Sequence, residues 1–237
     1  MWSYYGAKTN IVDLYPKPKH DLIIEPFAGS ARYALKYFEK DIILIDRYHV
    51  ITDIWKWLQM CSPNDILSLP RFKQGDNIND HTYNCVEERY LCGFLVGFGF
   101  ADPRKTATPR LRHRPNAMNY TINKIAGDLH KIKHWTIING SYNEADAENI
   151  SATRFIDPPY IVGGQVYKFG NNKIDYIDLG AYCKSRNGQT IVCESSNAKW
   201  LPFVPLKTQH VRSGYYAEGI WTNYHTHFDN VQQKLWL

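Results

Sequence analysis

The turn Asp157-Pro158-Pro159-Tyr160 combines residue types that could activate a weakly nucleophilic amine. It ends the strand-like run 153–157 and therefore lies at the carboxyl end of a strand, where open α/β sheets bind their ligands. Two consecutive prolines fix φ and remove two N–H donors, so the turn presents two acceptors, the Asp157 carboxylate and the Pro158 carbonyl. Tyr160 adds a flat ring beside them.

The chemistry that suits this turn is reaction at a planar amine such as N6 of adenine. The lone pair of that nitrogen is delocalised into the ring, which makes it a poor nucleophile. Two acceptors that hold both N–H bonds favour a pyramidal nitrogen and stabilise the positive charge that develops on it. An aromatic ring holds an extruded base by stacking. The plainer interpretation is a Pro-Pro turn that ends a strand and binds nothing.

A second candidate is the segment Glu25 to Ala31, which reads EPFAGSA between a strand-like run over 22–27 and helical spacing over 31–38. A turn of small residues there lets a ligand approach the backbone and the helix N-terminus, and Ser30 is the predicted N-cap. Neither GxGxxG nor GxxxxGK[ST] occurs in the chain, which argues against nicotinamide, flavin and P-loop phosphate binding. A tight turn without a ligand explains the segment equally well.

Asp46 ends the next strand-like run, 42–46, and follows Gly29 by 17 residues. In nucleoside-binding α/β folds an acid at this place, about 20 residues beyond the glycine turn, accepts hydrogen bonds from ribose hydroxyls. The N-terminal segment Tyr4-Tyr5-Gly6-Ala7-Lys8 adds aromatic rings and a lysine, which suit a ligand that carries a sulfonium and a carboxylate. A helix-capping acid and an ordinary N-terminal arm are the alternatives.

The elements that must position these residues alternate in both halves of the chain. We expect strands at 22–27, 42–46, 135–139, 153–157, 189–194, 206–212 and 231–236, and helices at 31–38, 50–60 and 175–185. This order predicts a doubly wound sheet with mostly parallel strands. In between, 62–82 and 97–115 are loop-like, whereas 86–96 and 121–133 are helical. Residues 1–60 and 134–237 are therefore expected to form the core, and 61–133 an inserted region.

Positive charge is concentrated in the insertion. Residues 103–127 contain no Asp or Glu and hold six Lys or Arg residues, although the whole chain has a net charge of only +5. The segment is typical of a surface that contacts nucleic-acid phosphates, and a solvated basic loop is the alternative. The predicted contacts come from Arg104, Lys105, Arg110, Arg112 and Arg114.

The composition disfavours several other classes of protein. The five cysteines are scattered and form no CxxC pair, which argues against a disulfide framework and against a zinc site. No apolar run reaches 18 residues, so neither a membrane span nor a membrane partner is expected. The N-terminus lacks the apolar region of a signal peptide. The predicted compartment is the reducing cytoplasm.

The order of these parts resembles the Dam-like family of DNA adenine-N6 methyltransferases: an aromatic-Gly-Lys arm, EPFxG, a strand-end acid, an insertion and DPPY. The resemblance covers essentially the whole chain. It implies a Rossmann-like S-adenosylmethionine-dependent methyltransferase fold, with a seven-stranded, mostly parallel sheet and a mainly helical recognition region. It also implies site-specific methyl transfer from S-adenosylmethionine, without a metal, to the exocyclic amine of a flipped adenine in double-stranded DNA.

The resemblance assigns roles to individual positions. Gly97 to Phe100 and the basic residues after it look like the DNA-contacting region of the family. The catalytic positions would be Asp157, Pro158, Pro159 and Tyr160. The cofactor-binding positions would be Tyr4, Tyr5, Lys8, Glu25, Phe27, Ala28, Gly29, Ser30, Asp46, Ser141, Tyr142 and Asp157. The implied setting is a bacterial or phage-encoded, nucleoid-associated protein, with a cognate restriction endonuclease as a partner where a restriction–modification pair exists.

One departure from the family pattern concerns the first turn. Family members usually carry a second glycine two residues after the first, where this chain has Ala31. Other acceptors that present a planar amine remain open: RNA adenine, cytosine N4 and a protein glutamine amide. A DNA-binding homologue that has lost catalysis is also open, and Ala31 is its only support.

Overall fold

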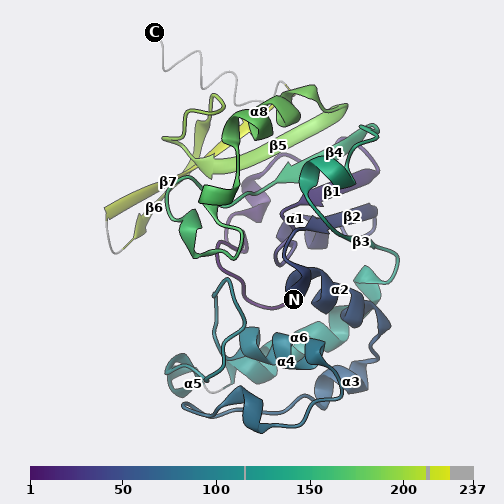
Figure 1. The fold of residues 1–237 in the computed structure, drawn as a ribbon, viewed down its shortest axis with the longest axis vertical. Coiled ribbons are helices and arrows are strands. Elements are labelled where there is room, and N and C mark those ends of the chain that lie inside the picture. Colours follow the sequence, from purple (N-terminus) through teal and green to yellow (C-terminus); the bar gives the residue numbers. More distant parts are fainter. Residues whose placement is uncertain (115, 212–213, 225–237) are drawn as a thin grey trace.

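A computed structural model describes residues 1–114, 116–211 and 214–224 (Figure 1). Its centre is a seven-stranded sheet with the order β3-β2-β1-β4-β5-β7-β6. Strands β1 to β5 pair in parallel, whereas β7 runs antiparallel to both β5 and β6. The strands are β1 Leu22–Pro26, β2 Asp41–Asp46, β3 Thr136–Asn139, β4 Ala152–Ile156, β5 Gly188–Ser195, β6 Val204–Val211 and β7 Gly214–Thr222.

The helices alternate with the parallel strands and then cluster between α2 and β3. The α-helices are α1 Arg32–Lys36, α2 His49–Met60, α3 Pro63–Leu67, α4 Val86–Leu95, α5 Arg110–His113, α6 Ala117–Asp128, α7 Tyr142–Ala145 and α8 Tyr176–Ser185. Short 3-10 turns are η1 Val12–Leu14, η2 Ile78–Asp80, η3 Leu129–Ile132, η4 Gly164–Val166 and η5 Asn171–Lys173. No helix within the described ranges is long and apolar enough to cross a membrane.

The mixed α/β architecture with a mostly parallel seven-stranded sheet is confirmed. The strands predicted near β1 to β6 all form, and β4 is buried along its whole length although it includes Thr153 and Arg154. The strand predicted at 231–236 lies outside the described residues, and β7 was not predicted. The loop predicted at 62–82 contains α3, a five-residue helix that begins with a capping box between Ser62 and Asp65.

The helices of residues 61–133 pack against the sheet-covering helix α2 through one continuous core. Trp55 on α2 belongs to the same buried cluster as Ile66 on α3, Phe94 on α4 and Ile122 on α6. The N-terminus runs between these helices and the sheet, as Figure 1 shows. There the fully buried Trp2 ring lies 4.8 Å from Trp55 and 6.2 Å from Phe94, measured between ring centroids. This packing fixes the arm that carries Tyr4 to Lys8.

Candidate functional site

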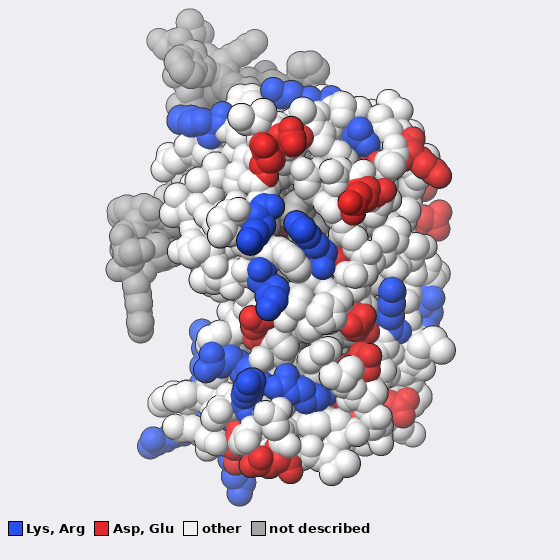
Figure 2. Space-filling view, in the orientation of Figure 1, with Lys and Arg blue, Asp and Glu red and all other residues white. Residues whose placement is uncertain are grey.

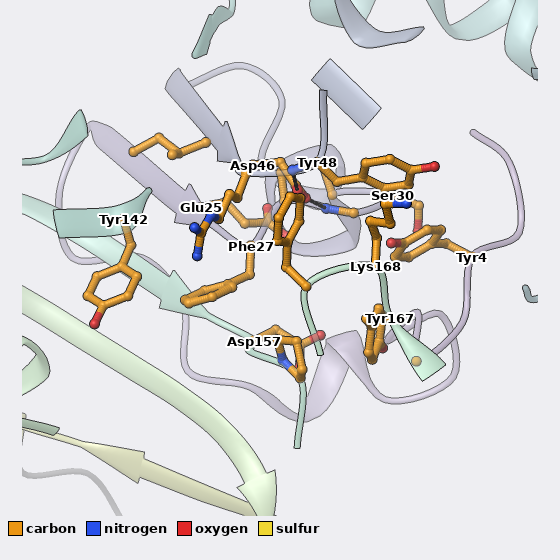
Figure 3. A pocket seen from close by; sticks show the side chains of 18 of the residues that line it. Tyr4, Glu25, Phe27, Ser30, Asp46, Tyr48, Tyr142, Asp157, Tyr167 and Lys168 are labelled. Carbon is orange, nitrogen blue, oxygen red and sulfur yellow. Dashed lines mark hydrogen bonds between the residues drawn. The ribbon is translucent and has the colours of Figure 1, made fainter. Parts of the chain in front are cut away.

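A cavity of about 250 Å³ opens at the carboxyl ends of β1, β2 and β4. The N-terminal arm, the turn after β1 and the loop after β3 all border it, as the close-up in Figure 3 shows. Parallel strands bring their carboxyl ends to one edge of the sheet, so residues far apart in the sequence meet there. All twelve residues predicted to bind a cofactor line this cavity: Tyr4, Tyr5, Lys8, Glu25, Phe27, Ala28, Gly29, Ser30, Asp46, Ser141, Tyr142 and Asp157.

The turn after β1 has an unusual backbone. Phe27, Gly29 and Ala31 have φ values of 63°, 47° and 46°, all in the left-handed region. A Cβ at Gly29 would lie 3.0 Å from Cδ1 of Tyr4, so glycine lets the arm cross directly over the turn. Ala31 occupies a conformation that favours glycine. Alanine at this position, where the Dam-like family usually has glycine, therefore strains the backbone.

The N-cap predicted at Ser30 is wrong. Ala31 stands at the N-cap of α1, and its side chain cannot accept a hydrogen bond. The first-turn N–H of Ala34 instead donates to Glu25 Oε2 at 2.9 Å, so a buried acid of β1 caps the helix from below. Burial raises the pKa of Glu25 to about 8, against the opposing effect of the Ala34 hydrogen bond. Ser30 is buried and lines the cavity.

Asp46 is held by backbone donors on both of its oxygens. The Gly29 N–H donates to Oδ2 at 3.0 Å, and the Tyr48 N–H donates to Oδ1 at 2.8 Å. Burial raises the pKa of Asp46 to about 6, although these two hydrogen bonds lower it. Each carboxylate oxygen keeps a second lone pair, so Asp46 can still accept a hydrogen bond from a ligand.

Two aromatic rings form one end of the cavity. The centroids of Phe27 and Tyr142 lie 5.4 Å apart, and Figure 3 shows Tyr142 on the opposite side of the site from Tyr4 and Tyr167. Tyr142 packs against the ring of Tyr182, whose hydroxyl donates to Asp146. The contacts of Asp146 therefore help to fix Tyr182, and through it the position of Tyr142 at the cavity.

A buried ion pair supplies that support. Arg154 in the middle of β4 is completely buried and binds Asp146 through Nε and through Nη2, the latter at 2.9 Å from Oδ1. Its Nη1 also donates to the Asn187 carbonyl at 2.6 Å. The bidentate geometry compensates for the desolvation of both charges. The pair thus ties the loop after β3 to the strand that carries Asp157.

Lys8 reaches from the arm to Asp157 in the DPPY turn. Its Nζ lies 2.7 Å from Asp157 Oδ1 and donates to the Gly6 carbonyl at 3.0 Å. Burial alone lowers the pKa of Lys8, but the charges of Asp157 and Glu218 outweigh it and hold that pKa above its usual range. Burial raises the pKa of Asp157, and Lys8 opposes this rise.

The four residues of the DPPY turn face different surroundings. Asp157 and Pro159 line the first cavity, and Tyr160 faces a second one. The Pro159 carbonyl accepts a hydrogen bond from the Tyr176 hydroxyl at 2.5 Å. Pro158 is buried, and within the described residues no donor bonds its carbonyl. Pro158 is not among the residues that line either cavity, so of the acceptor pair expected from the sequence only Asp157 is placed at the first cavity.

The second cavity, of about 440 Å³, lies on the other side of the arm. Residues 4–8 and Tyr167 line both cavities and so form the wall between them. Phe98, Gly99 and Arg110 line the second cavity together with Tyr160. The aromatic-glycine segment singled out in the sequence thus borders the same cavity as Tyr160 of the DPPY turn.

The five predicted DNA-contacting residues, Arg104, Lys105, Arg110, Arg112 and Arg114, are all exposed. Two of them also support their own segment. Arg110 donates to the Phe98 carbonyl at 2.7 Å, and the Arg104 guanidinium lies 4.7 Å from the ring centre of Phe100. On the face of the molecule drawn in Figure 2, Lys and Arg side chains form a band across the lower part and also surround the hollow at the middle.

Sequence reasoning missed the loop after the DPPY turn. Tyr167, Lys168 and Phe169 line the first cavity, and Figure 3 shows Tyr167 and Lys168 on the side opposite Tyr142. The Tyr167 hydroxyl donates to the Tyr5 carbonyl at 3.1 Å, and the Arg47 guanidinium lies 4.8 Å from the Phe169 ring centre. The only sequence signal was a pair of aromatic residues flanking a lysine, which has no spacing that predicts a site.

Comparisons with known proteins add little to this geometry. No protein-family model matches the chain, and no curated protein matches it. A solved structure that matches is a conserved hypothetical protein from Streptococcus pyogenes, 11% identical, with a TM-score of 0.35 over 86% of this chain and 88% of that one. This similarity is too low to assign a role to any residue. No group of three or more His, Cys, Asp or Glu that could hold a metal occurs in the described part of the chain.

Proposed function

We propose that this protein is an S-adenosylmethionine-dependent methyltransferase that acts on the N6 amine of adenine in DNA. The observation that carries the proposal is the place of Asp157. Its carboxyl group lines the first cavity together with every other residue predicted to bind the cofactor, and the same turn presents Tyr160 to the second cavity. A methyl donor and an acceptor base would meet at this turn.

The first cavity has groups that match S-adenosylmethionine. Phe27 and Tyr142 would hold a planar base, Asp46 would accept hydrogen bonds from ribose hydroxyls, and the aromatic residues of the arm would favour a cationic tail. The cofactor supplies an electrophilic methyl group on a sulfonium sulfur. The sheet order, with an antiparallel β7 between β5 and β6, supports a Rossmann-like methyltransferase fold.

The acceptor groups match a primary amine on a planar ring. The Asp157 carboxylate and the Pro158 carbonyl would each accept one N–H of the amine, which directs the nitrogen lone pair toward the methyl donor. Tyr160 would stack on the base. Its other face is covered, because Lys8 Nζ lies 4.8 Å from the ring centre.

DNA as the substrate rests on the surroundings of the second cavity. Phe98 and Arg110 bring the exposed basic segment to the rim of that cavity, so a base that enters it would leave its phosphates near these cations. An extruded nucleotide needs such contacts because unstacking costs a few kcal/mol. A protein glutamine amide would gain nothing from five exposed cations.

The test is methyl transfer from labelled S-adenosylmethionine to unmethylated duplex DNA, followed by digestion to nucleosides. Wild type should produce N6-methyladenine, and Asp157→Ala should produce about 100-fold less or none. Asp178→Ala is the matched control, since Asp178 is an exposed acid on α8 outside both cavities. Parallel reactions with RNA distinguish the acceptor. Label in N4-methylcytosine or in RNA alone would redirect the proposal, and equal incorporation by Asp157→Ala would end it.

A further inference from the structure

Glu218, on β7, brings a buried carboxyl group to the hydroxyl of Tyr160. It is 3% exposed, and its Oε1 accepts hydrogen bonds from the Tyr160 hydroxyl at 2.6 Å and the Tyr15 hydroxyl at 2.7 Å. The same oxygen lies 3.9 Å from Lys8 Nζ. One buried oxygen of Glu218 therefore lies close both to the hydroxyl of Tyr160 and to Lys8, the lysine that pairs with Asp157.

These contacts hold Tyr160 at two points. Glu218 fixes the hydroxyl, and the Lys8 ammonium lies over one face of the ring. Tyr160 and Glu218 both line the second cavity, so a flat ligand in that cavity would meet the Tyr160 side chain. A ring that is already fixed loses less conformational freedom when a flat ligand stacks on it, so stacking becomes more favourable.

We propose that Glu218 is a positioning residue for the extruded base. It fixes the plane of Tyr160 through the hydroxyl and holds Lys8 between two carboxyl groups, so that the stacked amine meets the Asp157 acceptor. The inference rests on the proposed function, because it concerns the base that Tyr160 would stack. The ligand class is an amino-purine that has left a duplex.

Tyr15 provides a control within the same network. Its hydroxyl donates to the same oxygen of Glu218, but its ring is buried and packs against Phe155 at 5.0 Å. Tyr15 lines neither cavity. Tyr15→Phe therefore removes one hydrogen bond from Glu218 without touching the ring that faces the base.

The experiment measures kcat and KM for methylation, cofactor affinity and the fluorescence of 2-aminopurine at the target position. Glu218→Ala should lower kcat about tenfold or more and weaken the quenching that stacking on Tyr160 causes, with cofactor affinity within about twofold of wild type. Glu218→Gln keeps an oxygen acceptor and should restore the quenching. In the double variant with Tyr160→Phe, Glu218→Ala should add little, since both remove the same contact. Tyr15→Phe should lower the melting temperature and leave the quenching unchanged.

The outcomes separate the inference from the proposed function. If wild type transfers no methyl group to nucleic acid, both are overturned. If wild type is active but Glu218→Ala has the same effect with and without Tyr160→Phe, or Tyr15→Phe reduces quenching as strongly, Glu218 only supports the fold. If Glu218→Ala does not fold, Tyr160→Phe is the test, because it removes the same hydrogen bond from the other side. Its kcat should fall about tenfold, and an unchanged kcat overturns the positioning role.

Discussion

Lys8 Nζ and Asp157 Oδ1 lie 2.7 Å apart, although one residue belongs to the N-terminal arm and the other to the end of β4. Both side chains are shielded from water, with 8% and 21% of their surfaces exposed. The electrostatic attraction between the two groups is therefore stronger than it would be in water. Burial raises the pKa of the Asp157 carboxyl, and the Lys8 ammonium opposes this rise. The ammonium therefore favours the ionised carboxylate, which is the form that accepts hydrogen bonds from an amine.

Replacement of Lys8 should shift the pH dependence of the reaction. Lys8→Met removes the charge that lowers the pKa of Asp157, so that pKa should rise further, and the acid limb of kcat should move to higher pH. Lys8→Arg keeps the charge and should move the limb much less. The measurement is kcat between pH 5 and 9 for the three proteins. An acid limb that stays in place in Lys8→Met contradicts the role of the pair.

Most of the site was predictable because its residues lie in local motifs at strand ends. Asp46 and Asp157 each end an apolar run, and parallel pairing brings such ends to the same edge of a sheet. The apolar runs of β1 and β2 could be recognised because largely buried parallel strands are rich in apolar residues, whereas β3 has no buried residue.

The unpredicted parts depend on contacts between distant residues. Strand β7 was not predicted although five of its nine residues are Tyr, Ile, Trp or Thr, which favour strands, because two glycines and the acid Glu218 interrupt the apolar pattern. Its place is fixed by pairing with β5 and β6, and the acid is compensated by Tyr15, 203 residues away in the chain. The cap of α1 was misassigned for a similar reason: the acceptor is Glu25 on the preceding strand, whereas local rules consider only Ser30.

Glu25 should make stability depend on pH. Its folded pKa is raised from 4.5 to about 8, so the folded state binds the proton more tightly than the unfolded state. The corresponding stability is fully present below about pH 4.5 and is lost as pH rises through 8. Glu25→Gln keeps an acceptor for the Ala34 N–H and cannot ionise. It should be close to wild type at pH 5 and more stable by about 1–3 kcal/mol at pH 9.

Urea denaturation at pH 5, 7 and 9 measures this difference in the free energy of unfolding. Glu144→Gln is the control, because Glu144 is an exposed acid on α7. It should leave the pH dependence of wild type in place. A Glu25→Gln variant that parallels wild type at all three pH values would show that Glu25 is ionised in the folded protein at neutral pH.

Ala31→Gly should stabilise the protein. At φ 46° the Ala31 methyl group is strained, and glycine removes a cost of about 1 kcal/mol while adding some unfolded-state entropy. The expected net gain is about 0.5 kcal/mol, seen as a higher melting temperature, with cofactor affinity equal to wild type or tighter. Ala34→Gly is the control within the same helix, where φ favours alanine, and it should destabilise by about 1 kcal/mol. Loss of stability in Ala31→Gly would mean that the methyl group contributes packing that exceeds the strain.

The basic segment should determine how DNA binding depends on salt. Each phosphate contact that is removed lowers the slope of log K against log [salt] by about 0.9. Replacement of Arg104, Lys105, Arg112 and Arg114 by Gln should therefore flatten the slope by up to about 3.6 and weaken binding to all sequences alike. Arg110 is left in place because it also bonds the Phe98 carbonyl at the rim of the second cavity.

Lys56→Gln with Lys184→Gln is the control, since these exposed lysines lie on α2 and α8 outside both cavities. Titration of labelled duplex DNA by fluorescence anisotropy from 50 to 300 mM salt gives both slopes. Equal slopes for the fourfold variant and wild type would place the DNA on another face, and a flattened slope in the control would mean that charge acts without regard to position.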